Sequence, residues 1–139
     1  MIYLDTNVFI SALSPEEINK EAHAILVKIA NGKVNAATSC LTWDELVWGL
    51  RKFFSKDIIT KTGRNFLALP NLILLNVDSN VVSMAQTIVE KYTIAPRAAL
   101  HAAAAIRNGA EFIISDDRDF DKIKEIKRLG IKEFNTRFL

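Results

Sequence analysis

Residues 1–10 read MIYLDTNVFI, a short apolar run that ends in an acid and leads into a second apolar patch. The run is typical of a β-strand that ends at Asp5, and Thr6 and Asn7 supply turn or capping groups before a short helix over residues 8–13. The stretch therefore predicts a strand, a turn and a helix in that order. It also places a carboxylate at the end of the strand.

The rest of the chain repeats this alternation of strand and helix. A possible capping box at Ser14, Pro15 and Glu17 predicts the start of the next helix, and Asn31 and Gly32 predict its end. Strands are predicted at 34–39, 72–77, 112–115 and, at the edge, 130–134; helices are predicted at 42–54, 57–69, 79–92, 96–106 and 120–129. Such alternation predicts βαβ units and a mostly parallel sheet with helices on both faces. The apolar run at 72–77 predicts a strand that is buried on both of its faces.

Length and composition restrict the class of protein. At 139 residues, the chain has the length of one domain, so residues 1–139 are predicted to form a single unit. The net charge of +2 comes from 18 basic and 16 acidic residues, so bulk charge does not indicate a nucleic-acid partner. Cys40 is the only cysteine, which excludes an internal disulfide and favours a reducing compartment, the cytoplasm. Neither a secretory signal nor a membrane span is predicted, because no apolar run approaches about 20 residues.

Acidic residues follow two of the predicted strands. Ligands of open parallel sheets bind at the carboxyl ends of the strands, which selects Asp5 and the group of Asp116, Asp117 and Asp119. For Asp5 taken alone, capping of the following helix is the simpler explanation. Three carboxylates within four residues repel one another unless a cation or basic partners compensate, so the second group favours a functional site.

Glu45 is the third candidate acid. The run TWDE at 42–45 matches a capping box, so Glu45 taken alone is interpreted as structural. However, Asp5, Glu45 and Asp117 all stand where a helix begins after a strand, so the topology can bring them together. Hard oxygen ligands without a Cys or His cluster favour Mg²⁺ or Mn²⁺, and water activated by such an ion attacks phosphodiesters. The sequence therefore predicts a metal-dependent nuclease.

Four motifs in a fixed order extend this prediction. They are IYLDTNVFI at 2–10, Thr42-x-x-Glu45, PRAALHAAAAI at 96–106 and FIISDDRDF at 112–120, and they span essentially the whole chain. Together they resemble the PIN domain, particularly the VapC-like ribonuclease toxins of toxin–antitoxin pairs. The resemblance implies a three-layer α/β/α sandwich and the activity of a Mg²⁺- or Mn²⁺-dependent endoribonuclease.

The resemblance also assigns roles to individual residues. The acids that it implies for metal binding and catalysis are Asp5, Glu45 and Asp117, with Asp119 as an auxiliary. The residues that would orient these carboxylates or water are Thr6, Asn7, Ser115 and Asp116. The basic residues predicted to contact RNA phosphates are Arg97, as the first choice, and Arg118.

One position departs from the family pattern. Most relatives carry an aspartate after Pro96-Arg97, in a PRDALH-like run, where this chain has Ala98. An acid there would face the cluster in the first turn of its helix, whereas an alanine cannot bind metal. The chain is therefore an engineered inactive form, a naturally weakened or inactive member, or one in which Asp116 or Asp119 compensates. We predict that activity is reduced and metal binding weaker as the chain stands, and that Ala98→Asp strengthens both.

Other conspicuous residues have ordinary explanations. His101, on the alanine-rich run, is interpreted as a packed or hydrogen-bonded residue without a catalytic role. Trp43 and Trp48 lie on an otherwise apolar predicted helix, so they are interpreted as core or interface anchors rather than as platforms for stacking bases.

Competing functions remain at this point. A haloacid-dehalogenase-like phosphotransferase would need a second acid where this chain has Asn7, and no glycine-rich phosphate loop is present. The alternatives left open are a catalytically silent PIN domain that binds RNA or protein, favoured by Ala98, and an RNA-processing PIN nuclease outside toxin–antitoxin pairs. The resemblance implies as partners an RNA substrate, a small antitoxin that inserts a peptide near the acidic groove, and a second copy of the chain.

Overall fold

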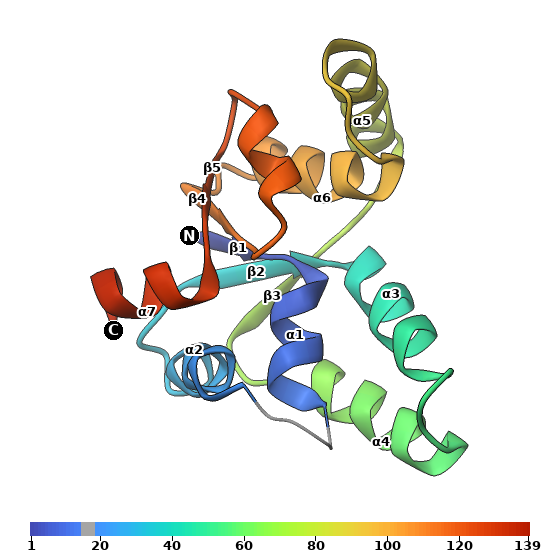
Figure 1. The fold of residues 1–139 in the computed structure, drawn as a ribbon, viewed down its shortest axis with the longest axis vertical. Coiled ribbons are helices and arrows are strands. Elements are labelled where there is room, and N and C mark those ends of the chain that lie inside the picture. Colours follow the sequence, from blue (N-terminus) through green and yellow to red (C-terminus); the bar gives the residue numbers. More distant parts are fainter. Residues whose placement is uncertain (15–18) are drawn as a thin grey trace.

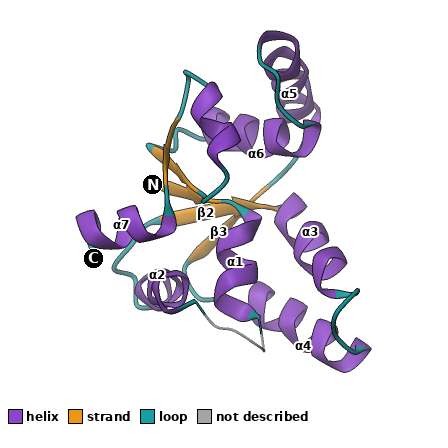
Figure 2. Ribbon diagram, viewed as in Figure 1, coloured by secondary structure: helices purple, strands orange, loops and turns teal. Residues whose placement is uncertain are grey.

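A parallel sheet forms the middle layer of the computed structural model, which describes residues 1–14 and 19–139 (Figure 2). Its strands are β1 (Ile2–Leu4), β2 (Ala36–Ser39), β3 (Leu72–Leu75), β4 (Phe112–Ile114) and β5 (Lys127–Leu129). They lie in the order β3-β2-β1-β4-β5, and every neighbouring pair is parallel. The prediction of a mostly parallel sheet is confirmed.

Helices cover both faces of this sheet (Figure 1). They are α1 (Thr6–Leu13), α2 (Lys20–Ala30), α3 (Cys40–Leu50), α4 (Lys56–Leu67), α5 (Ser79–Lys91), α6 (Pro96–Arg107), the short 3₁₀ helix η1 (Arg118–Lys122) and α7 (Ile131–Phe138). Residues of α1, α2, α4 and α7 share one core, and residues of α5, α6 and η1 share the other. The predicted three-layer α/β/α arrangement is therefore confirmed. Within the described part of the chain, no helix has the length and apolar character needed to cross a bilayer.

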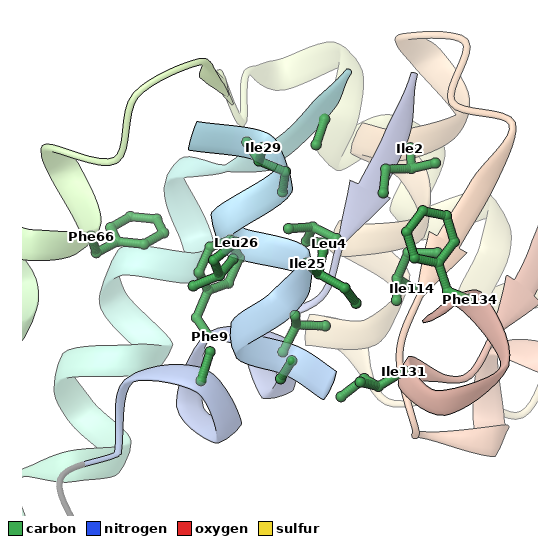
Figure 3. Packing of buried hydrophobic residues seen from close by; sticks show 14 of the residues in the cluster. Ile2, Leu4, Phe9, Ile25, Leu26, Ile29, Phe66, Ile114, Ile131 and Phe134 are labelled. Atoms are coloured by element: carbon green, nitrogen blue, oxygen red, sulfur yellow. The ribbon is translucent and has the colours of Figure 1, made fainter. Parts of the chain in front are cut away.

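The two cores follow from alternation along the strands. Successive side chains of a strand point to opposite faces, so Leu4 lies in the first core while Tyr3 lies in the second. Figure 3 shows the first core, in which Leu4 packs against side chains of α2 and α7. Phe9 and Phe66 meet edge to face there, with ring centroids 5.0 Å apart, and so tie α1 to α4.

Several helix starts match the capping signals of the sequence. The Asp78 side chain accepts a hydrogen bond from the Val81 amide at 3.0 Å, and Pro96 stands in the first turn of α6. The start of the second helix is different, because α2 is capped by Asn19, whose Oδ1 accepts from the Ala22 amide at 2.9 Å. Of the predicted capping box, Pro15 and Glu17 lie outside the described residues.

Three predictions, one about the strand at 72–77 and two about the C-terminal region, are wrong. The strand at 72–75 is not buried on both faces, because β3 is an edge strand in which Ile73 is 44% and Leu74 40% exposed. The predicted helix at 120–129 is replaced by η1 and β5, and the predicted strand at 130–134 is part of α7. Phe120, Ile123 and Ile126 recur every third residue and suggested a helix, but they reach the core from a 3₁₀ turn and an extended segment.

Candidate active site

The candidate site lies where the order of the strands reverses. The chain moves from β1 to β2 and β3 on one side of the sheet, whereas β4 and β5 lie on the other side. Crevices of open α/β sheets form at this kind of switch point, at the carboxyl ends of the strands. A pocket of about 350 Å³ opens there. Its lining residues are Asp5, Thr6, Asn7, Ile10, Glu45, Trp48, Ala95, Arg97, Ala98, His101, Asp117 and Phe120.

Asp5 caps helix α1 and also lines the pocket. Its Oδ1 accepts a hydrogen bond from the Thr6 amide at 2.8 Å, which caps α1, and its Oδ2 accepts from the Ser115 hydroxyl at 2.7 Å. The capping interpretation is therefore confirmed. Burial raises the pKa of Asp5, although the charge of His101 and the Ser115 hydrogen bond oppose this shift.

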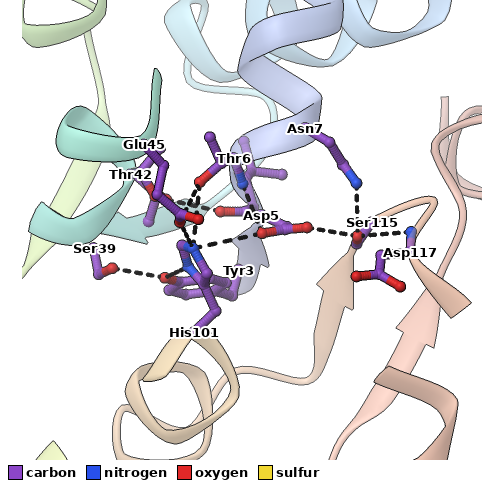
Figure 4. A network of polar contacts seen from close by, with 12 residues as sticks. Tyr3, Asp5, Thr6, Asn7, Ser39, Thr42, Glu45, His101, Ser115 and Asp117 are labelled. Carbon is purple, nitrogen blue, oxygen red and sulfur yellow. Dashed lines mark hydrogen bonds and ion pairs between the residues drawn. The ribbon is translucent and has the colours of Figure 1, made fainter. Parts of the chain in front are cut away.

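Ser115 joins β4 to the first helix. The side chain is fully buried, and its Oγ accepts from the Asn7 side-chain amide and from the Asp117 backbone amide, both at 3.0 Å (Figure 4). Since the same hydroxyl donates to Asp5, it fixes the spacing between Asp5 and the segment that carries Asp117. The other end of the Asn7 amide, Oδ1, is buried and has no hydrogen-bond partner among the described residues.

The capping box predicted for Glu45 is wrong. Helix α3 begins at Cys40, so Thr42 lies inside the helix, and its hydroxyl contacts the Thr38 hydroxyl at 2.6 Å instead of capping the helix. The Glu45 side chain is thereby free to turn toward the pocket. There it accepts a hydrogen bond from the Thr6 hydroxyl at 3.0 Å and contacts the imidazole of His101.

His101 occupies the centre of the polar network (Figure 4). It is only 2% exposed, its Nδ1 lies 2.7 Å from the Tyr3 hydroxyl, and that hydroxyl donates to Ser39 at 2.9 Å. Its Nε2 contacts Glu45 and lies 3.6 Å from Asp5 Oδ1. The interpretation as a hydrogen-bonded residue is confirmed, but the sequence did not indicate that its partners would be the candidate acids. Its place three residues after Ala98, and so on the same helix face, is the signal that was available.

The contact with His101 also decides the ionisation of Glu45. Burial alone would raise the pKa of this carboxyl, but the hydrogen bond and charge of His101, with the Thr6 hydroxyl, bring it below its ordinary value of 4.5. The ionised form is thus favoured by folding. Its contribution to stability is present above pH 4.5 and is lost as the pH falls through the lower pKa of the folded state.

We therefore expect Glu45→Gln to lower the free energy of unfolding at pH 7 by about 1–2 kcal/mol, since a charge-assisted hydrogen bond is lost. Near pH 3 the difference from the parent chain should be small. The measurement is urea unfolding at both pH values in EDTA, with Asp44→Asn, an exposed neighbour, as the control. The pKa shift of Asp5 changes stability in the opposite direction, but it is present in both proteins. It therefore largely cancels in the difference between their free energies of unfolding. A difference of the same size at both pH values would contradict the prediction.

The carboxylates of Asp116, Asp117 and Asp119, which follow β4, have three different surroundings. Asp117 lines the pocket, and its Oδ1 accepts from the Asp119 amide at 2.9 Å. Asp116 faces α7 instead, where its Oδ1 accepts from the Ile131 amide at 2.9 Å and caps that helix. The Asp119 carboxylate pairs with Lys122 at 3.2 Å and is not among the groups that line the pocket.

Only one of the two arginines predicted to bind RNA lines the pocket. Arg97 and Ala98, at the start of α6, line the pocket, whereas Arg118 does not. The predicted location of position 98 opposite the other acids therefore agrees with the structure. The sequence predicts Trp43 and Trp48 to be core or interface anchors, and a place in the core is wrong for both, because they are 44% and 52% exposed. Trp48 lies at the pocket. Their role as interface anchors stays a prediction.

The donor chemistry of the pocket suits a hard divalent cation. Asp5, Glu45 and Asp117 supply carboxylate oxygens, and the unpartnered Asn7 Oδ1 is an additional oxygen that no protein donor satisfies. These side chains supply fewer ligands close together than a bound divalent ion would require. Among residues 1–14 and 19–139, no three Asp, Glu, His or Cys side chains are arranged to hold a metal ion. The oxygen atoms of these side chains are of the kind that such an ion prefers, and Ala98 lines the same pocket without supplying one.

Comparison with known proteins gives the same picture of the fold. The family model of the PIN domain matches residues 2–126. No curated protein sequence matches the chain.

Several solved structures share the fold at low sequence identity. VapBC2 from Rickettsia felis, bound to a DNA fragment from its promoter, has a TM-score of 0.75 at 20% identity, over 94% of this chain and 98% of that one. DNA-bound VapBC from Salmonella typhimurium has a TM-score of 0.74 at 18% identity, covering 94% and 99%. VapC20 from Mycobacterium tuberculosis, described as a sarcin-ricin loop cleaving toxin, has a TM-score of 0.68 at 14% identity, covering 87% and 93%.

Proposed function

Since the chain belongs to the PIN domain family, we propose that it is a metal-dependent endoribonuclease that acts as the toxin of a type II toxin–antitoxin pair. The observation that carries this proposal is the convergence of Asp5, Glu45 and Asp117 on one pocket from widely separated parts of the chain. A pocket lined by acids, with Arg97 at its edge, suits a phosphodiester whose charge is balanced by a cation.

In this proposal, Asp5, Glu45 and Asp117 hold Mg²⁺ or Mn²⁺. When bound, such an ion makes water a better nucleophile and offsets charge on the phosphoryl oxygens. Thr6 and Ser115 hold the carboxylates of Glu45 and Asp5 in place through the hydrogen bonds described above.

The other candidate side chains act on the substrate or on the acids. Arg97 is placed to bind an RNA phosphate. Asn7 helps to orient the Asp5 carboxylate, because its side-chain amide donates to the Ser115 hydroxyl, which in turn donates to Asp5. Asp119 and Arg118 contribute at longer range, because neither lines the pocket. Asp116 acts only by holding the segment that carries Asp117 against α7.

The partners proposed for this chain follow from its relatives. Solved structures with the same fold include one described as a toxin–antitoxin complex and one described as a member of the VapBC family of toxin–antitoxin systems, so we propose a small antitoxin as the protein partner. A homodimer and a cytoplasmic location are also part of the proposal, the latter supported by the single unpaired Cys40. An RNA-processing nuclease outside such pairs has the same pocket and is distinguished by the lack of a neighbouring antitoxin gene.

Ala98 favours one alternative, a catalytically silent PIN domain that binds RNA or protein. The two functions differ in whether the remaining acids support any turnover. They are therefore separated by a cleavage assay at high protein concentration rather than by binding alone.

We expect slow cleavage of single-stranded RNA by this chain in Mn²⁺, which EDTA abolishes and Asp117→Asn reduces by at least about tenfold. The reason is that Asp117 is the acid of its cluster that reaches the pocket. The measurement is the initial rate of product formation on labelled RNA. Asp44→Asn, which removes an exposed acid of α3 outside the pocket, is the matched control and should cleave at the parental rate. Cleavage that survives EDTA or Asp117→Asn would refute the assignment, and no cleavage at all would support the silent alternative.

A further inference from the structure

Trp48 is the one large aromatic side chain of the pocket that remains widely open to solvent. It lines the pocket together with Glu45 and Asp5, and it is 52% exposed, whereas the other aromatic lining residue, Phe120, is 1% exposed. The Trp48 indole therefore offers a large, flat and accessible apolar surface directly beside the candidate acids.

Helix geometry places Trp48 between an acid and a cation. Glu45, Trp48 and Arg51 follow one another at intervals of three residues, so they lie along one side of α3 and just beyond it. The Arg51 guanidinium carbon lies 3.3 Å from the centroid of the Trp48 ring, in a cation–π contact. The row thus begins with the candidate catalytic acid Glu45, continues with the flat ring of Trp48 and ends with the exposed positive charge of Arg51.

This row has the composition of a site for a single-stranded nucleic acid. Nucleobases stack on tryptophan and on arginine planes, and arginine also binds the adjoining phosphates. Arg97 contributes a second exposed cation on the same pocket. We propose that Trp48 and Arg51 form a platform on which an unpaired base next to the scissile phosphate stacks. This inference rests on the proposed function, because it names the substrate as single-stranded or unpaired RNA.

The other tryptophan provides an internal comparison. Trp43 stands on the same helix and is 44% exposed, but it lines a different groove with Val47, Ile59 and Leu67. This groove also includes Thr60 and Arg64, but none of its lining residues is a carboxylate. Trp48 differs in that it adjoins the candidate acids and lies between Arg51 and the pocket that contains Arg97, and these two arginines can bind phosphates on either side of a stacked base.

The test is binding of the full chain to a short unstructured RNA in EDTA, where cleavage does not interfere. The chain has two tryptophans, so Trp43→Phe leaves Trp48 as the only indole and Trp48→Phe leaves Trp43. We expect RNA to quench the fluorescence of the first variant and not that of the second. Trp48→Ala should weaken binding about tenfold, whereas Trp48→Phe should retain most of it and Trp43→Ala should match the parent.

A second binding experiment identifies which base of the RNA stacks on Trp48. An oligonucleotide with one abasic position, moved along the sequence, should bind the parent chain more weakly at one position and bind Trp48→Ala equally well at all positions. Fully paired duplex RNA should not quench Trp48. Equal binding of RNA by Trp48→Ala and the parent would overturn the platform, and so would a change from dimer to monomer on Trp48→Ala in sedimentation, since a second copy would then cover the ring.

The results also separate this inference from the proposed function. If Trp48 responds to RNA but no variant cleaves in Mn²⁺, the platform stands and the nuclease assignment fails. If the chain cleaves RNA and Trp48→Ala binds and cleaves like Trp43→Ala, the assignment stands and the platform fails. If the parent chain binds no RNA at all, the platform fails.

Discussion

Ala98→Asp is expected to strengthen Mn²⁺ binding and to raise the rate of RNA cleavage, each by about 100-fold. Position 98 lines the same pocket as Asp5, Glu45 and Asp117, so the new carboxylate would face three acids that are already in place. Four carboxylates repel one another when no cation is bound. An ion relieves that repulsion, and its affinity therefore rises with the added charge.

The substitution should not disturb folding. Residue 98 lies in the first turn of α6, where an acid interacts favourably with the positive end of the helix. Metal affinity is measured by calorimetry and cleavage by initial rates. Ala98→Asn is the matched control, since it has the same shape without the charge and should bind metal no better than the parent chain. Equal affinity and rate for the alanine and aspartate forms would mean that position 98 does not belong to the metal site.

Asp5→Asn is expected to reduce cleavage about 1000-fold when it is introduced into the Ala98→Asp protein. Losing several kcal/mol of transition-state stabilisation corresponds to this factor, because each 1.36 kcal/mol is about tenfold. Both carboxylate oxygens of Asp5 accept hydrogen bonds, one from the Thr6 amide and one from the Ser115 hydroxyl. An asparagine has a single acceptor, so one of these two donors would face an amide NH₂ group.

The same substitution should change stability far less than activity. Burial raises the pKa of Asp5, so its ionised form is disfavoured by folding, and stability falls as the pH rises through that pKa. Removal of the charge at pH 7 therefore offsets the damaged hydrogen bond, and we expect the free energy of unfolding to change by at most about 1–2 kcal/mol. Asp78→Asn is the control, because Asp78 also caps a helix through its side chain but lies outside the pocket. Retention of more than a tenth of the activity by Asp5→Asn would exclude Asp5 as a principal ligand.

Local signals account for the parts of the fold that sequence reasoning predicted. Asp78 and Pro96 mark helix starts through capping and a fixed backbone angle, which depend on neighbouring residues alone. The C-terminal region could not be predicted in this way. Ile126 and Leu129 have the spacing of a helix, but pairing of β5 with β4, between Leu129 and Ile114, holds this segment extended. Such pairing depends on a distant strand.

The candidate site was predictable to a similar extent. Asp5 and Asp117 could be chosen because parallel strands end at the same edge of a sheet. The role of His101 could not, since its partners Tyr3 and Glu45 come from elements far away in the sequence. Trp48 was assigned to the core or to an interface for a related reason. An aromatic residue on an apolar helix is usually buried, whereas Trp48 is exposed, and which side of a helix faces solvent depends on the tertiary packing.

The acids of the pocket differ in how firmly they are tied to the fold, and this has a consequence for how such a protein can change over generations. Asp5 caps α1 and Asp117 caps η1, so a change at either position disturbs a helix start as well as the chemistry. Position 98 holds no cap, and its alanine leaves α6 intact. If position 98 belongs to the metal site, a lineage would be able to lower or restore the activity there without losing a helix cap. Substitution of Asp5 or Asp117 would instead combine a loss of activity with the loss of a cap.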